Sequence, residues 1–234
     1  RHAAVVCADA LEFDIESEFV RKVIATRALT APSNAGEAWP WPVKLYGLRP
    51  FGIVIDGEPL RFDGKAPAKP LQLLRLLIAQ GGEPTAIGGV MDRLWPDLEA
   101  DDARRAFDVT LNRLRALLVQ RDVLLLADGK LGFDAHRVWI DTHALAQVLR
   151  EAGTNAADAA ARKRSFERIA RLYRQPLLAG DDDPWIVGAR EQWRRLGDGY
   201  RVEARFVVWE GVDVLQVPAG ALFRLRDGWA VFVV

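Results

Sequence analysis

The sequence predicts a mainly α protein with β structure, an α+β fold. Three observations support this class. Short stretches repeat their apolar residues every two positions, as strands do, and longer stretches repeat them every three to four positions, as helices do. The strand-like stretches come first, followed by three helix-like stretches and a hairpin. Half of the 234 residues are apolar, which is enough for a buried core.

Charge and composition limit the classes of protein. The 32 basic and 32 acidic residues cancel, but basic residues gather at 102–121 and 156–178, so nucleic-acid binding is not excluded. The longest purely apolar runs, 123–127 and 230–234, are shorter than the roughly 18–20 residues of a membrane span. We find no secretion signal and expect a cytoplasmic protein. Because the chain begins at Arg1 and stops in an apolar run, we interpret it as a fragment of a longer protein.

Side chains typical of catalysis or metal binding are scarce, so we expect no enzyme, no cofactor and no metal site. Cys7 is the single cysteine, which excludes an internal disulfide and a Cys-based zinc site. His136 and His143 lack a carboxylate partner at a metal spacing. The acidic run 181–183 is followed directly by Pro184 and is interpreted as a turn that begins a helix.

The first domain, residues 1–42, is predicted to be a helix and a linker. Residues 1–29 form the helix, with an apolar stripe that includes Phe19, Val23 and Leu29. Residues 31–42 form the linker and end in Trp39-Pro-Trp-Pro42, which favours extended geometry.

A second domain, residues 43–141, begins with strands and continues with helices. The strands are expected at 43–48, 51–55 and 59–62, and the Asp56-Gly57 pair predicts a hairpin turn. Pro70 lies in the first turn of a helix that ends at Gly81-Gly82. A shorter helix follows at 87–94.

The next helix, 103–120, is expected to be capped by Asp101 or Asp102. Its inner face carries Ala103, Phe107, Leu111, Leu114 and Leu118. Strands 123–126 and 131–133 flank Asp128-Gly129, a second hairpin, and 138–140 is one more strand. Strands, three helices and a hairpin in this order form a winged helix-turn-helix.

The remaining chain divides into helices and a tail. Helices are expected at 142–152, 156–178 and 185–195, which form a third domain, 142–195. The tail, 196–234, is β-rich, with strands at 200–209, 214–217 and 229–234.

Several motifs resemble a bacterial regulator family. The segments 65–74, Leu94-Trp95-Pro96-Asp97 and 103–115 are similar to the OmpR-type winged helix, most closely that of the antibiotic regulatory proteins (SARP). The segments 138–141, 172–178 and Asp183-Pro184-Trp185 resemble the second half of that family, the bacterial transcriptional activator domain. This resemblance implies that residues 142–195 form part of a domain similar to tetratricopeptide repeats.

The tail resembles a different family. Residues 197–205, 207–210 and 214–223 are similar to part of an HlyD-type periplasmic efflux adaptor. The resemblance covers fewer than forty residues, so the tail is expected to be a fragment joined by a fusion, a frameshift or an assembly artefact.

The helix 103–120 is the candidate DNA reader. Arg105, Val109, Asn112 and Arg113 follow helical spacing and form one outer stripe, suited to guanine, adenine and thymine-methyl contacts. Asp108 is expected either to contact cytosine or to form a local ion pair with Arg104, Arg105 or Asn112. The OmpR-type pattern implies base and phosphate contacts at these positions. Phosphate contacts are assigned to Thr110 and Arg115, and the wing contact to Lys130. The alternative is that this arginine-rich helix is simply a solvated face.

The favoured function is a sequence-specific DNA-binding transcriptional regulator, an activator that reads the major groove with helix 103–120. The resemblance implies double-stranded DNA, RNA polymerase and self-association on DNA repeats as partners. The expected polymerase contact is the loop that carries Trp95, Asp97, Glu99 and Asp101. One alternative is a protein-interaction scaffold that uses 142–195 and carries a degenerate winged helix. A third is an efflux-adaptor fragment.

Overall fold

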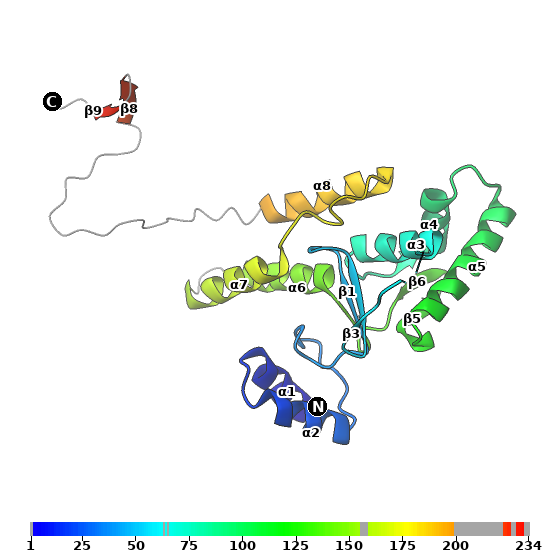
Figure 1. The fold of residues 1–234 in the computed structure, drawn as a ribbon, viewed down its shortest axis with the longest axis horizontal. Helices are drawn as coiled ribbons and strands as arrows, with labels where there is room; N and C mark the ends of the chain where they lie inside the picture. Colours follow the sequence, from blue (N-terminus) through cyan, green and yellow to red (C-terminus); the bar gives the residue numbers. More distant parts are fainter. Residues whose placement is uncertain are drawn as a thin grey trace. The chain divides into compact units, whose positions relative to one another are not determined.

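The structure is a computed structural model that describes residues 2–62, 64, 66–154, 159–198, 222–225 and 228–231. The chain divides into two compact units, 1–199 and 200–234, which are described separately. Figure 1 shows the elements of both. The helices of the first unit are α1 (His2–Glu12), α2 (Ser17–Thr26), α3 (Ala68–Ala79), α4 (Ile87–Leu94), α5 (Ala100–Leu117), α6 (Asp141–Thr154), α7 (Ala159–Leu172) and α8 (Pro184–Asp198). A 3-10 turn, η1 (Arg121–Val123), follows α5.

The N-terminal segment is a pair of helices, not the single helix expected over 1–29. The chain turns between α1 and α2, where Asp14 and Glu16 have φ of 53° and 47°. The Ser17 hydroxyl donates a 2.6 Å hydrogen bond to Asp14 and holds this turn. Phe19 of the expected stripe is 64% exposed. The buried side of the pair packs with the two linker tryptophans, Trp39 and Trp41, and with Trp139.

A four-stranded sheet lies beside this cluster, in the order β3-β2-β1-β7. Its strands are β1 (Val43–Tyr46), β2 (Gly52–Ile55), β3 (Glu58–Pro59) and β7 (Val138–Ile140). The β1 strand pairs antiparallel with β2 and parallel with β7, with Val43 opposite Val138. Asp56 and Gly57 have φ of 49° and 90°, so the predicted β2–β3 hairpin turn is confirmed.

The three central helices surround the main core. The predicted limits of α4 and the predicted end of α3 at Gly81-Gly82 are confirmed, and both glycines have positive φ. The α5 helix begins at Ala100, three residues earlier than expected, and its N-cap is Glu99, which makes no side-chain cap bond. Asp101 and Asp102 therefore do not cap it. They lie in its first turn, where the helix dipole favours carboxylates.

The wing is a second sheet, in the order β4-β6-β5. Its strands are β4 (Thr85–Ala86), β5 (Leu124–Ala127) and β6 (Lys130–Phe133). Asp128 and Gly129 have φ of 50° and 71°, so the second predicted hairpin is also confirmed. The N–H of Ile87, the first residue of α4, donates to the Gly129 carbonyl at 2.9 Å, which ties the wing tip to the helix-turn-helix.

The α7 helix ends at Leu172, not at the expected residue 178. Pro176 disfavours a helical conformation in the residue before it, and Leu178 has a φ of 46°. Leu177 and Leu178 are instead buried, and the N–H of Leu178 donates to the Gly47 carbonyl at 2.7 Å. The segment 173–183 therefore packs on the end of β1.

The α8 helix begins at Pro184, as the Asp-Asp-Asp-Pro turn predicts, and continues to Asp198, past the boundary expected after 195. The indole N–H of Trp193 donates a 2.9 Å hydrogen bond to the Ala79 carbonyl, which joins α8 to the end of α3.

The second unit contains an antiparallel hairpin of β8 (Leu222–Leu225) and β9 (Gly228–Val231). The expected strand 229–234 overlaps β9, whereas the expected strands 200–209 and 214–217 lie outside the described residues, as does most of the adaptor-like segment. Every helix in the described part of the chain is too short or too polar to span a membrane.

Candidate nucleic-acid interface

The α5 helix separates an inner face from an outer face, as its sequence period predicts. The expected inner residues are all buried: Ala103, Phe107, Leu111, Leu114 and Leu118. The residues of the predicted outer stripe are all exposed: Arg105, Val109, Asn112 and Arg113. The core therefore holds α5 while the predicted stripe stays accessible.

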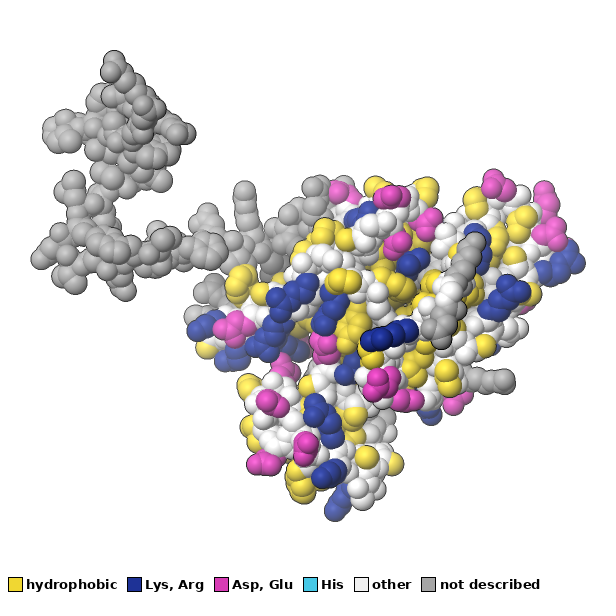
Figure 2. Space-filling view, viewed as in Figure 1, with side chains coloured by type: hydrophobic (Ala, Val, Ile, Leu, Met, Phe, Trp, Pro, Cys, Tyr) yellow, Lys and Arg dark blue, Asp and Glu magenta, His cyan; other side chains and the backbone are white. Residues whose placement is uncertain are grey.

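Two arginines of α5 are engaged in ion pairs along the helix. Arg104 Nε lies 3.1 Å from Asp108 Oδ2, and Arg105 Nη2 lies 2.5 Å from Asp102 Oδ1. All four side chains are at least half exposed, and exposed pairs of this kind contribute only about 0.3–0.5 kcal/mol. Asp108 thus forms the local ion pair that was one of its two expected roles. Figure 2 shows acidic side chains beside basic ones where α5 begins.

Two of the expected phosphate contacts face inward. Thr110 is 6% exposed, because it is three residues after Phe107 and lies on the same buried face. Arg115 is half-buried and turned toward the wing, with Nη2 3.5 Å from the Leu124 carbonyl oxygen. Its Nε is buried and has no hydrogen-bond partner among the described residues. Neither side chain is a free surface group for phosphate.

Arg113 differs from its neighbours. It is exposed, and within the described residues it has no recorded ion pair or side-chain hydrogen bond. Its charge is therefore available to a partner without breaking an internal contact.

The wing brings a further cation to the same structural module. Lys130 is exposed at the start of β6, directly after the Asp128-Gly129 tip. Leu125 and Leu126 on β5 are 49% and 42% exposed, an apolar surface that sequence reasoning missed. The all-apolar run 123–127 was the available signal, because β5 lies at the edge of a small sheet and cannot bury both faces of such a run.

The loop before α5 combines one anchored residue with several exposed ones. Trp95 packs at the edge of the core, with Lys69 Nζ 5.5 Å from its ring centroid. Lys69 Nζ also donates to the Leu94 carbonyl at 2.9 Å. Asp97, Glu99 and Asp101 are exposed, and Leu98 between them is 45% exposed. The acidic part of the predicted partner loop is thus accessible, while Trp95 fixes its base.

The side chains that could bind a metal ion are scattered in the described part of the chain. No set of three or more His, Cys, Asp or Glu side chains in the described ranges is arranged to hold a metal ion. Burial lowers the pKa of His143, which favours the neutral imidazole.

Comparison with known proteins finds similarity at the level of structure. No protein-family model matches the chain, and no curated protein matches it. The solved structure of Mycobacterium tuberculosis EmbR in complex with a low-affinity phosphopeptide is similar, with a TM-score of 0.51 and 21% identity. The match covers 68% of this chain and 44% of that one, so this chain spans less than half the length of the relative. At this identity the likeness establishes a shared fold.

Proposed function

We propose that this protein is a sequence-specific DNA-binding transcriptional regulator, an activator of the SARP type, that places α5 in the major groove. The observation that carries the proposal is the exposed stripe of α5 beside a wing that ends in Lys130. A helix of this kind fits the major groove of B-DNA, and a wing beside it reaches the phosphate backbone. The fold shared with EmbR is consistent with this assignment.

The side chains of the stripe have separate roles in this proposal. Arg113 donates two hydrogen bonds to guanine, Asn112 pairs with adenine, and Val109 contacts a thymine methyl group. Arg105 exchanges its exposed contact with Asp102 for DNA, which costs little because the pair is solvated. Lys130 supplies a phosphate contact from the wing.

The partner contacts belong to other parts of the fold. The exposed carboxylates Asp97, Glu99 and Asp101 form the proposed RNA polymerase contact. Helices α6 to α8 form the proposed surface for self-association on repeated DNA sites.

Selection of sequences from random duplex DNA by the full chain, at two salt concentrations, tests this proposal. Affinity is expected to fall steeply with salt, and the selected sequences are expected to converge on a repeated motif. Arg113→Ala should then weaken binding to that motif by about tenfold or more, since a two-bonded guanine contact contributes about 1–3 kcal/mol. The matched control is Lys22→Ala on α2, which removes an exposed charge away from the stripe. Equal affinities of Arg113→Ala and the parent chain would reject the reading role of α5.

The second candidate is a protein-interaction scaffold built on residues 142–195. The ion pairs of Arg104 and Arg105 favour it, because they reduce the free positive charge on α5. The exposed Leu125 and Leu126 favour it as well, since apolar surface suits a protein partner better than phosphate. Absence of DNA binding at low salt, together with partner capture that persists after deletion of residues 43–141, would favour this function.

A further inference from the structure

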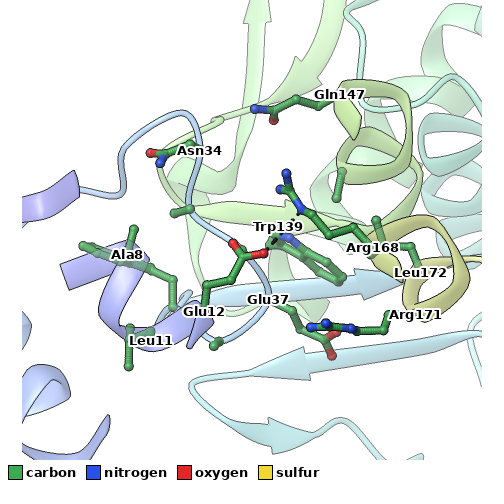
Figure 3. A pocket seen from close by; sticks show the side chains of 15 residues that line it. Ala8, Leu11, Glu12, Asn34, Glu37, Trp139, Gln147, Arg168, Arg171 and Leu172 are labelled. Atoms are coloured by element: carbon green, nitrogen blue, oxygen red, sulfur yellow. Dashed lines mark ion pairs between the residues drawn. The ribbon is translucent and has the colours of Figure 1, made fainter. Parts of the chain in front are cut away.

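A cavity of about 190 Å³ lies between the N-terminal segment and the helical part of the first unit. Its wall is formed by α1, the linker, β7, α6 and α7 (Figure 3). Trp39 and Trp139 supply apolar surface, and Leu11 and Leu172 extend it from α1 and α7. A second hollow, which shares Glu12, Asn34, Arg168 and Arg171 with the first, extends the site along α7.

Both carboxylates in the wall of the first cavity, Glu12 and Glu37, are engaged by arginines. Arg168 is shared, because its Nη1 also lies 3.0 Å from Glu151 Oε2. Glu12 Oε1 lies 3.4 Å from Arg168 Nε, the ion pair drawn in Figure 3. Glu37 Oε2 lies 2.8 Å from Arg49 Nη2, and its other oxygen accepts a 2.9 Å hydrogen bond from the Tyr46 hydroxyl. The cavity therefore offers no free carboxylate from these two residues to a cationic ligand.

Two donors of the cavity lack partners. Arg171 is exposed and has no recorded ion pair or side-chain hydrogen bond within the described residues. Trp139 is 4% exposed, and its indole N–H has no hydrogen-bond partner among the described residues. In Figure 3 the indole lies between the Glu12–Arg168 pair and Arg171. An unsatisfied buried donor costs about 1–3 kcal/mol, so it marks a place where an acceptor belongs.

We propose that this cavity binds a small amphipathic organic anion, an aromatic or branched-chain carboxylate. The carboxylate pairs with Arg171, and its second oxygen accepts from the Trp139 N–H once the Glu12–Arg168 pair shifts. The apolar body lies against Trp39 and Leu172. Small-molecule sites are usually lined mainly by apolar side chains, with a few polar groups that point toward the ligand. The proposal does not depend on whether α5 binds DNA.

Occupancy would connect three parts of the fold. The wall joins α1, the sheet strand β7 and helix α7, which are far apart in the sequence. A ligand that contacts all three stabilises their mutual packing and thereby the folded state.

Calorimetric titration of the full chain with 1-naphthoate, and with the uncharged 1-naphthalenemethanol, tests the proposal. The parent chain should bind naphthoate about tenfold more tightly than the alcohol, because charge-assisted hydrogen bonds are the stronger ones. Arg171→Met should abolish this preference while the alcohol still binds. Lys163→Met is the matched control, since this exposed residue is on the same helix but outside the cavity wall, and the preference should persist in it.

A cavity-filling variant separates this site from the exposed apolar surface elsewhere. Ala144→Leu, on α6 at the cavity wall, should abolish binding of both compounds. Ala38→Leu fills the cavity from the linker side and replaces Ala144→Leu in this test if Ala144→Leu does not fold. The proposal is overturned if naphthoate fails to bind the parent chain at millimolar concentration, if a folded filling variant still binds it, or if Arg171→Met retains the carboxylate preference.

Discussion

The backbone N–H of Leu48 donates a 2.8 Å hydrogen bond to the carboxylate of Asp141, 93 residues later in the chain. The N–H of Gly47 donates to both oxygens of the same carboxylate at 2.9 Å. Asp141 is the first residue of α6 and is fully buried. One side chain thus joins the end of β1 to the start of the helical part of the first unit.

The buried Asp141 makes stability fall as the pH rises from about 4 to 6. Burial raises the pKa of its carboxyl to about 6, although the backbone N–H donors act in the opposite direction. The folded state therefore holds a proton that the unfolded state has already lost, so the free energy of unfolding decreases with pH in this window. A rise of about two pKa units corresponds to about 3 kcal/mol.

The measurement is urea unfolding of the parent chain and Asp141→Asn between pH 4 and pH 7. Asn does not titrate, so the parent stability minus that of Asp141→Asn should fall across this range. A difference that stays constant or rises with pH contradicts the assignment.

Gly47→Ala should destabilise the protein by about 1–3 kcal/mol. A Cβ at this position would lie 2.7 Å from Cγ2 of Ile78, which is fully buried, so the side chain or the backbone must shift. Gly88→Ala in α4 is the matched control, because a Cβ there meets nothing within 4 Å. That control should be at least as stable as the parent chain, because Gly88 lies in the first turn of α4 and alanine is the better helix former. The midpoints of urea unfolding measure the stability of both variants. A Gly47→Ala chain as stable as the parent chain would contradict the prediction, because it would mean that Ile78 shifts without cost.

Arg190→Met should loosen the segment between α7 and α8. The Arg190 guanidinium donates to the carbonyls of Leu177 and Asp181 at 2.7 and 2.6 Å and also to that of Leu178. Loss of hydrogen bonds to a charged group costs about 1.5–3 kcal/mol. Hydrogen exchange of residues 173–183 should accelerate in Arg190→Met and stay unchanged in Arg27→Met, an exposed arginine on the N-terminal segment. Similar exchange in both variants would mean that the segment is held without Arg190.

Asp102→Asn should strengthen binding to DNA of arbitrary sequence by several fold. The substitution removes an acidic charge that repels phosphate, and Arg105 no longer has to leave its 2.5 Å ion pair before it contacts DNA. Glu18→Gln on α2 removes the same charge away from α5 and should give a smaller gain. Fluorescence anisotropy at several salt concentrations measures both, and equal gains would show that only net charge matters.

The regular parts of the fold follow from local patterns. The apolar period placed α4 and β7 at their observed limits, and the two Asp-Gly pairs identified both hairpin turns. The outer stripe of α5 follows from the same period. The buried residues occupy one face of the helix, so the polar residues between them must lie on the opposite face. Its roles in DNA contact remain predictions.

Other parts had only a weak local signal or none. The turn between α1 and α2 is favoured by Asp14 and Ser17, but it lacks the glycine or proline that marks a turn more strongly. Threonine occurs on either side of a helix, so the burial of Thr110 depended on the exact angle of α5 against the core. The cavity around Trp139 is assembled from well-separated segments, which no single stretch of sequence describes.

The parallel pairing of β1 with β7 also determines when the sheet can be completed. Val43 lies opposite Val138, so β1 keeps an open edge until the three helices and the wing have been synthesised. Contacts between such distant positions slow folding, since a long loop must close before they form. An exposed strand edge also invites pairing with other chains. A nascent or shortened chain that ends before β7 should therefore be the form most prone to aggregate.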